Sequence, residues 1–379
     1  MKKKICFVST FFGTAEKFLH EHIMKLSEEY DITLVCDYQE KDYEVLTDLP
    51  VKYKKITIER KISVLTDFKS IWQLYIFFRK EKFWAIHALS HKPGLLVPIA
   101  AIMAGCKHRV YTFTGQYWAS KTGLKRWVLK EIDFLIALLH NHVMIDGFSQ
   151  RQFLLDEHVI SEDKSIVLGN GSICGVNLSK FDPQVSVREA MRKECRIGGD
   201  KVVFTYLGRL CKDKGITELI EAFNKLVVDC PNAFLAFVGW DEDGYLQKIQ
   251  SYQNIKEGEN FLFYGATTEP EKTYQISDVA CIPSYREGFG MCVIEASALG
   301  IPVICSDVYG ILDSYIDGVT GLKCKAKDVN SLYDCMKTLY DNSAMRHELG
   351  RGGRKFIEDN YSSAYVTQCW YDYYKSISD

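Results

Sequence analysis

Two glutamates eight residues apart could hold the hydroxyl groups of a sugar or a ribose. Glu287 lies in a loop with two glycines, Gly288 and Gly290, and Glu295 lies in the helix predicted to begin near Met291. Glycines let backbone N–H groups approach a ligand, and a helix N-terminus favours an anion such as phosphate. The same glutamates would also suit the acidic start of an ordinary helix. Because a predicted strand, this loop and a helix follow one another, we expect a ligand site.

A pair of cations follows another predicted strand, Val202–Leu207. Arg209 and Lys214 lie between this strand and the helix predicted from Ile216. Two cations at the carboxyl end of a strand suit a diphosphate, and an arginine can contact its oxygens through two donors. A solvated basic turn would contain the same residues, so the interpretation as a phosphate site depends on the glutamate loop.

Together these segments resemble two motifs of the retaining GT-B glycosyltransferases, which use nucleotide-sugar donors. The Glu-x7-Glu motif is here Glu287 to Glu295, and the Gly-Arg-x4-Lys-Gly motif is Gly208 to Gly215. The order of the predicted elements matches the family along nearly the whole chain, and the second half carries the stronger resemblance. Within the family, the chain looks most like bacterial enzymes that extend a sugar on a polyprenyl diphosphate carrier.

The resemblance implies a role for each residue of the motifs. Arg209 and Lys214 would neutralise the leaving diphosphate, Glu287 would contact the donor sugar, and Glu295 would hold the ribose hydroxyls. The other donor-binding residues that the resemblance implies are Gly13, in the loop after the first predicted strand, Gly288, Phe289, Gly290 and Met291. The family transfers the sugar with retention, and the reaction takes place on one face of the sugar, so no protein nucleophile is expected. Preorganised cations and N–H groups would stabilise the charge of the leaving group.

The predicted acceptor side departs from the family pattern. Many members carry a histidine after a strand in the middle of the first domain, where this chain has Thr114. A threonine hydroxyl can donate a hydrogen bond but cannot act as a base near neutral pH. His91, in the loop after the preceding predicted strand, could substitute for that histidine or could simply cap a helix. Both interpretations of His91 stay open.

Neither a metal nor another cofactor is expected. Asp241 and Asp243 resemble the Asp-x-Asp signature of metal-dependent glycosyltransferases. They precede a helical stretch, however, where acids favour the helix N-terminus, and this is the plainer interpretation. The His-x-His pairs at 20–22 and 140–142 each have a carboxylate within a helical turn, Glu16 and Asp146, but no Cys or further His nearby completes a site. The 13 cysteines form no Cys-x-x-Cys pair, and many lie in apolar runs, which is typical of buried thiols in a reducing cytoplasm.

Short apolar runs alternate with helical patterns along the chain, which predicts parallel sheets with helices on both faces. Strands are expected at 5–8, 32–36, 84–88, 109–113, 143–145, 165–168, 202–207, 234–238, 261–264, 279–282 and 303–305. Helices are expected at 16–29, 68–82, 94–105, 123–139, 216–228, 291–299, 329–340 and 363–377. A first strand also explains the start of the chain better than a signal peptide does.

The expected fold class is α/β, and the resemblance implies GT-B, with two Rossmann-like doubly wound domains that face a central cleft. The periodicity stops at 169–177, a run rich in Gly, Asn and Ser. We therefore expect an acceptor-side domain at 1–175 and a nucleotide-sugar-binding domain at 176–360. Residues 361–379 should form a C-terminal helix that returns to the first domain. Ligands of such domains bind at the carboxyl ends of the strands.

Composition and charge limit the partners. The 379 residues suit two domains, and 47% apolar with 25% charged residues is typical of a folded protein. The net charge of −2 argues against a nucleic-acid partner. Residues 1–180 nevertheless carry a balance of +5. The aromatic and basic stretches 68–80 and 121–130 could lie on an anionic membrane or could be ordinary half-buried helices.

The sequence thus predicts a retaining hexosyl- or N-acetylhexosaminyltransferase. The expected donor is a UDP-sugar, with uridine implied by the resemblance alone, and the expected acceptor is a polyprenyl-diphosphate-linked saccharide. The expected location is cytoplasmic and peripheral, at the inner face of the cell membrane. Two alternatives stay open. One is a nucleotide-sugar epimerase of the same layout, and the other is a non-catalytic nucleotide-sugar binder, which Thr114 suggests.

Overall fold

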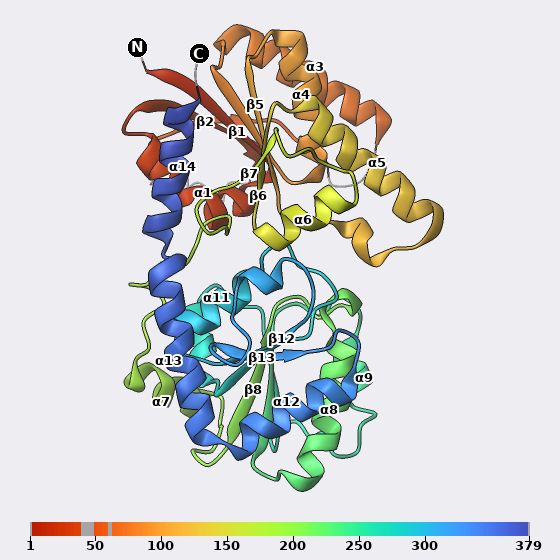
Figure 1. Cartoon of the computed structure of the whole chain (residues 1–379), viewed down its shortest axis with the longest axis vertical. Helices are drawn as coiled ribbons and strands as arrows, with labels where there is room; N and C mark the ends of the chain where they lie inside the picture. Colours follow the sequence, from red (N-terminus) through yellow and green to blue (C-terminus); the bar gives the residue numbers. More distant parts are fainter. Residues whose placement is uncertain (1, 39–48, 60–62, 378–379) are drawn as a thin grey trace. The chain divides into compact units, whose positions relative to one another are not determined.

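A computed structural model describes residues 2–38, 49–59 and 63–377. The chain divides into two compact units (Figure 1). The first unit consists of Met1–Cys174 and Ser363–Asp379, and the second consists of Gly175–Ser362. The last helix, α14 (Ser363–Ser376), is therefore part of the first unit.

The first unit is built on a seven-stranded parallel sheet in the order β3-β2-β1-β4-β5-β6-β7. Its strands are β1 (Lys3–Phe11), β2 (Tyr30–Asp37), β3 (Lys52–Lys55), β4 (Ala85–Leu89), β5 (His108–Phe113), β6 (His142–Ile145) and β7 (Ser165–Val167). Its helices, besides α14, are α1 (Phe12–Leu26), α3 (Val64–Glu81), α4 (His91–Ala104), η2 (Tyr117–Ser120), α5 (Gly123–Leu139) and α6 (Phe148–Asp156). Helices α1 and α14 pack together on one face of the sheet, and α3, α4 and α5 cover the other (Figure 1).

The second unit has a six-stranded parallel sheet in the order β10-β9-β8-β11-β12-β13. Its strands are β8 (Val202–Leu207), β9 (Ala233–Val238), β10 (Phe261–Gly265), β11 (Val279–Ile282), β12 (Val303–Ser306) and β13 (Gly321–Cys324). Its helices are α7 (Val185–Glu194), η3 (Lys212–Lys214), α8 (Ile216–Asp229), α9 (Tyr245–Ile249), α10 (Pro270–Thr273), η4 (Tyr274–Ile276), α11 (Met291–Ala298), η5 (Ile311–Asp313), α12 (Val329–Asp341) and α13 (Ser343–Asn360).

Both sheets have Rossmann-like order, which confirms the predicted fold class. The direction in which new strands are added reverses between β1 and β4 in the first unit, and between β8 and β11 in the second. Such a reversal leaves a crevice at the carboxyl ends of the two strands, where α/β sheets bind ligands. The central strands are buried because helices cover both faces of each sheet, and every residue of β9 is buried. All 13 cysteines are free thiols, and seven of them are buried.

The 18-residue helix α13 was not expected from the sequence. It contains three glycines, which ordinarily weaken a helix. A Cβ atom on Gly350 would lie only 2.1 Å from the carbonyl oxygen of Gly300, and one on Gly352 would lie 2.3 Å from that of Val319. Glycine is needed here because the backbone of α13 packs directly against neighbouring backbone, a reason that the sequence alone does not reveal.

Two strands were also missed, and both lie at the edge of a sheet. Strand β3 has the sequence Lys-Tyr-Lys-Lys, and β13 has the sequence Gly-Leu-Lys-Cys. Edge strands often carry lysines, which discourage pairing with another chain, so they lack the apolar run that marks a central strand.

Candidate functional site

The two sequence motifs follow β8 and β11, the strands between which the order of the second sheet reverses. Gly215 lets their loops approach, because its φ is +68° and a Cβ atom there would lie 2.0 Å from the carbonyl oxygen of Pro283. The backbone N–H of Tyr285 donates to the carbonyl oxygen of Asp213 at 2.9 Å. Nε of Arg286 donates to the Asp213 carboxylate at 3.1 Å. The two loops therefore form one continuous surface.

Lys214 and Glu287 meet on this surface. Nζ of Lys214 donates to Oε1 of Glu287, and the same oxygen accepts a hydrogen bond of 2.8 Å from the Ser284 hydroxyl. The side chains are 21% and 14% exposed, respectively. The structure thus brings together a cation and a carboxylate that the sequence analysis assigned to different parts of one ligand. Ser284 was not identified from the sequence.

Arg209 lies at the same edge of the sheet, in contact with the segment that follows β9. Its side chain is 56% exposed, and Nη1 donates to Oε2 of Glu242 at 2.5 Å. A Cβ atom on Gly239 would lie 1.8 Å from the carbonyl oxygen of Gly208, so the two chain segments cross in direct backbone contact. Glu242 was not predicted as a site residue, although it lies between Asp241 and Asp243, which were considered as metal ligands.

Helix α11 begins at Met291, after Gly290 in a left-handed conformation with φ of +84°. Glu295 lies in this helix and is buried. The Phe289 ring is buried as well and packs edge-to-face on Tyr361, with 5.2 Å between ring centroids. Phe289 therefore has its side chain in the core, and its backbone is the part that could contact a ligand. The segment at Gly310 packs against the backbone of the glutamate loop, since a Cβ atom on Gly310 would lie 2.5 Å from the carbonyl oxygen of Gly288.

Tyr285 fixes the glutamate loop to helix α8. Its hydroxyl donates to Oε1 of Glu218 at 2.6 Å. Burial, together with this hydrogen bond, raises the pKa of Tyr285, so the phenol stays protonated and keeps its donor. Tyr285 is a further residue of this site that spacing and residue type did not single out.

The two aspartates of the Asp-x-Asp pair have hydrogen-bond partners in the backbone. Asp241 accepts from the N–H groups of Tyr245 and Leu246 at 2.8 and 3.0 Å, at the start of α9. Asp243 accepts from the N–H of Lys212 at 2.9 Å. These bonds favour the interpretation as helix-start and loop acids. Among the described residues, no group of three or more His, Cys, Asp or Glu side chains is arranged to hold a metal ion.

One histidine of each His-x-His pair is buried and hydrogen-bonded in the core. Nε2 of His22 lies 2.8 Å from the carbonyl oxygen of Ile173, and Nδ1 lies 2.8 Å from the Thr367 hydroxyl. Nδ1 of His140 lies 2.8 Å from the carbonyl oxygen of Ile136. Burial lowers the pKa of His22 and of His140 to about 4. Both are neutral core histidines at neutral pH.

In the first unit, the three residues predicted to bind donor or acceptor are Gly13, His91 and Thr114. Each follows the carboxyl end of one of three neighbouring strands. Gly13, expected in a loop, instead lies in the first turn of α1, because β1 continues to Phe11 and the helix follows at once. Thr114 directly follows β5, and His91 is the first residue of α4. Since β1, β4 and β5 are adjacent, the three residues lie along one edge of the first sheet.

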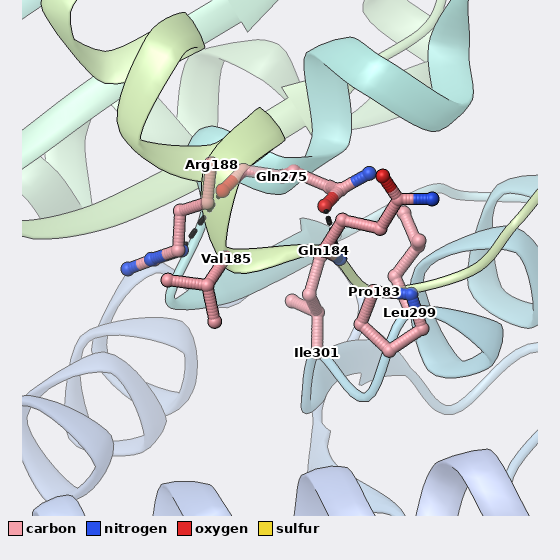
Figure 2. Close-up of a pocket in the computed structure, with 7 residues that line it drawn as sticks. All are labelled: Pro183, Gln184, Val185, Arg188, Gln275, Leu299 and Ile301. Atoms are coloured by element: carbon pink, nitrogen blue, oxygen red, sulfur yellow. Dashed lines mark hydrogen bonds between the residues drawn. The ribbon is translucent and has the colours of Figure 1, made fainter.

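The second unit contains a cavity of about 140 Å³ outside these motifs, and Figure 2 shows the side chains that line it. It is lined by Pro183, Gln184, Val185, Arg188, Gln275, Leu299 and Ile301. Its polar groups hydrogen-bond to one another. The N–H of Gln184 donates to Oε1 of Gln275, and Nη1 of Arg188 donates to the Gln275 carbonyl oxygen. The lining lies before β11 and β12, at the amino edge of the sheet. Ligands of such sheets bind at the opposite edge.

Comparison with known proteins relates part of this chain to a known family. Residues 187–356, which include both motifs and lie within the second unit, match the sequence model of the glycosyl transferases group 1 family. This chain is a glycosyltransferase. The matched segment contains both motifs, so it supports the resemblance that they carry in the second half of the chain.

Two curated relatives match this glycosyltransferase over most of their length. The capsular polysaccharide biosynthesis glycosyltransferase CapM of Staphylococcus aureus is 29% identical over 311 residues, 82% of this chain and 81% of the relative. A relative from Escherichia coli is 26% identical over 341 residues, 88% of this chain and 86% of the relative. That protein is named UDP-Gal:alpha-D-GlcNAc-diphosphoundecaprenol alpha-1,3-galactosyltransferase.

Solved structures support the fold of this glycosyltransferase. HepE of Anabaena, in complex with UDP-glucose, superposes with a TM-score of 0.82 at 16% identity, covering 99% of this chain and 100% of HepE. WaaG, a glycosyltransferase involved in lipopolysaccharide biosynthesis, gives a TM-score of 0.75 at 14% identity, covering 98% of this chain and 100% of WaaG. The architecture is GT-B, as predicted.

Proposed function

We propose that this glycosyltransferase moves a hexose or an N-acetylhexosamine from a UDP-sugar to a polyprenyl-diphosphate-linked saccharide, with retention at the anomeric carbon. The reaction would belong to the assembly of a bacterial surface or protein-linked glycan. The observation that carries the proposal is the Lys214–Glu287 contact, in the same group of loops as Arg209. The name of the Escherichia coli relative supports the lipid-linked acceptor, and the UDP-glucose complex of HepE supports the donor.

The donor would bind with its diphosphate at Arg209 and Lys214. Both cations already have a carboxylate partner, Glu242 and Glu287, so they are oriented by hydrogen bonds. The N-terminus of α11 adds backbone N–H groups and the positive end of the helix dipole. Charge develops on the diphosphate as the bond to the sugar breaks, and fixed positive groups stabilise that charge. The proposal therefore requires no metal ion.

The two glutamates would bind the sugar and the ribose. Glu287 is held by Lys214 and Ser284 through one oxygen, and its other oxygen could accept a hydrogen bond from a sugar hydroxyl. Glu295, buried in α11, would accept from the ribose hydroxyls. Gly288, Phe289 and Gly290 would contribute backbone contacts.

The lipid-linked acceptor would reach the first unit from a membrane surface. Helices α3 and α5 expose apolar side chains at helical spacing: Leu65, Phe68, Trp72 and Ile76 on α3, and Leu124, Trp127, Val128, Leu135 and Leu138 on α5. Helix α3 also buries Leu74 and Phe78 on another face. An ordinary half-buried helix shows polar residues to water, so the exposed apolar faces favour contact with lipid. No described helix is long and apolar enough to cross a membrane.

The basic residues of the stretch 121–130 contribute unequally to this surface. Arg126 and Lys130 bind the Glu157 carboxylate at 2.5 and 2.8 Å, so they have a structural role. Lys125 lies over the Tyr117 ring, 5.8 Å from its centroid. We therefore assign the attachment to the membrane mainly to apolar side chains. Lys125 would add electrostatic attraction to the anionic cytoplasmic leaflet.

Incubation with a panel of UDP-sugars, with and without polyprenyl-diphosphate-linked saccharides, tests the proposal. We expect transfer that needs both substrates, and the anomeric coupling constant of the product in NMR should show retention. The Lys214→Ala variant controls for contaminating activity. Epimerisation of the sugar without any acceptor, or binding without turnover, would contradict the proposal.

A further inference from the structure

His91 occupies the point at which the strand order of the first sheet reverses. It follows β4, next to the end of β1, where an α/β sheet binds its ligand. The preceding residue, Ser90, has φ of +71°, a conformation that is unfavourable for a non-glycine residue and that occurs often at functional sites. The Ser90 hydroxyl lies 3.1 Å from that of Thr10, at the end of β1. The backbone that carries His91 is thus held in place from the neighbouring strand.

Helix α4 is pressed against the sheet just after His91. A Cβ atom on Gly94 would lie 2.4 Å from Cε2 of Tyr111, a fully buried residue of β5. Glycine at this position lets the first turn of α4 approach β5 more closely than any other residue would. The first turn of the helix, and with it His91, therefore has little freedom to move.

A buried carboxylate faces one nitrogen of the His91 ring. Asp133, on α5, is 1% exposed, and its Oδ2 accepts from Nε1 of Trp118 at 2.7 Å. Its Oδ1 lies 3.8 Å from Nε2 of His91. Neither of these two atoms has a hydrogen-bond partner among the described residues. Because a buried polar atom without a partner is costly, a small rotation of the His91 ring that closes this gap would be favourable.

The ring of His91 is nevertheless accessible, with 42% of the side chain exposed. With Nε2 turned towards Asp133, Nδ1 is the nitrogen left for a ligand. A carboxylate that accepts from one N–H of an imidazole fixes the tautomer, so the other nitrogen becomes an acceptor. This arrangement explains His91 better than helix capping does, because no side-chain hydrogen bond caps α4.

We propose that Nδ1 of His91 accepts a hydrogen bond from a hydroxyl group of the acceptor saccharide, and that Asp133 is the positioning residue that holds the ring in the required tautomer. The inference rests on the proposed function, since it assigns the saccharide to the first unit. Asp133 lies far from His91 in the sequence, on a different helix, and it belongs to no motif identified above.

Steady-state kinetics of four variants test this pair. We expect His91→Gln and Asp133→Asn each to lower kcat/KM for the lipid-linked acceptor about 10-fold, the value of one lost hydrogen bond, without changing the Kd of UDP. The double variant should be no worse than His91→Gln, because Asp133 acts only through His91. Trp118→Phe removes the other bond of Asp133 and should lower Tm while kcat/KM stays near the wild-type value. Additive losses in the double variant, or weaker UDP binding, would overturn the proposal.

The tautomer of His91 can be read without any activity. We expect nitrogen-15 NMR of the full chain to show Nε2 protonated and Nδ1 unprotonated for His91, and Asp133→Asn to give a mixture of tautomers. The amide oxygen in Asp133→Asn can still accept the hydrogen bond from Nε1 of Trp118. An unchanged Trp118 Nε1 signal would therefore confirm that the fold is intact. A proton on Nδ1 in the wild type, or the same tautomer in both proteins, would refute the positioning role. If the wild type transfers no sugar, the proposed function fails, and this measurement still decides whether the pair exists.

Discussion

Lys214 and Glu287 form an ion pair although 73 residues separate them in the chain. The pair joins the loop after β8 to the loop after β11, and the Ser284 hydroxyl binds the same glutamate oxygen. Each side chain is less than a quarter exposed, so the pair is shielded from water better than a surface ion pair. The cation and the carboxylate of the site consequently depend on each other, and removal of one leaves the other half-buried without its partner.

Replacement of either donor-site cation should reduce turnover. We expect Arg209→Ala and Lys214→Ala each to lower kcat about 100-fold, because one preorganised contact to a developing charge contributes about 3 kcal/mol. Lys214→Ala should also lower Tm, since Glu287 loses its partner. Lys212→Ala, at an exposed position in η3, is the matched control and should keep kcat near that of the wild type. Nearly unchanged kcat in both Arg209→Ala and Lys214→Ala would disprove this donor site.

Sugar transfer should survive EDTA. Arg209 and Lys214 supply positive charge, and Asp241 and Asp243 accept backbone N–H groups. We expect Asp241→Ala to destabilise α9 by about 1 kcal/mol, as loss of a helix cap does. The change should appear in Tm and should not be reversed by Mn²⁺. Loss of transfer in EDTA, with recovery on addition of Mn²⁺, would instead make these aspartates metal ligands.

Attachment to vesicles should depend on the exposed apolar face of α5. Leu124 and Trp127 are 75% and 59% exposed. Burial of such a side chain contributes about 1.5 to 3 kcal/mol, so the double change Leu124→Gln and Trp127→Gln should weaken binding by at least about 10-fold. Sedimentation with vesicles of phosphatidylcholine and phosphatidylglycerol measures the binding.

Two further variants complete that experiment. Lys125→Gln should weaken binding only at low salt, because its attraction of about 1 kcal/mol is screened by ions. Val228→Gln changes an exposed apolar residue of α8 in the second unit and should have no effect. If the wild type does not sediment at all, a soluble acceptor becomes the better proposal.

Acidification should destabilise the first unit through its buried histidines. The folded state lowers the pKa of His22 and His140 to about 4, whereas a histidine in the unfolded chain titrates near 6.5. The unfolded chain therefore binds protons more readily, and the stability present above about pH 6.5 is lost as the pH falls towards 4. At about pH 5 each histidine should cost about 2 kcal/mol of unfolding free energy.

Thermal unfolding between neutral pH and about pH 5 measures this loss. His22→Gln should flatten the dependence of Tm on pH, even though it lowers Tm at neutral pH. His20→Gln, at an exposed position on α1, should leave the slope unchanged. A slope that is identical in His22→Gln and in the wild type would show that His22 does not contribute.

Gly215→Ala should damage stability and donor binding together. The added Cβ would lie 2.0 Å from the carbonyl oxygen of Pro283, at a residue whose φ is +68°. The loop after β8, which contains Gly215, must move away from the loop after β11, so Lys214 would be displaced from Glu287. We expect a lower Tm and a higher Kd for UDP by calorimetry. Gly244→Ala also has positive φ but meets no atom within 4 Å, so it should lower Tm less and leave the Kd unchanged.

Local patterns in the chain were sufficient to predict the central strands and most helices. Helix α5 was predicted with its observed bounds, and β8 and β11 were predicted correctly as well. Apolar runs and glycine turns are properties of neighbouring residues, so they can be read without knowing the fold. Gly13 was placed wrongly in a loop because nothing in the sequence shows that β1 continues directly into α1.

Tertiary structure alone decided which side chains meet. The pairing of Lys214 with Glu287 follows from the adjacency of β8 and β11, and the approach of Asp133 to His91 follows from the packing of α5 beside α4. Such contacts depend on strand order and on the depth of packing, which no short segment encodes. The glycines of α13 make the same point: in the sequence they argue against a helix, and in the fold they allow that helix to touch its neighbours.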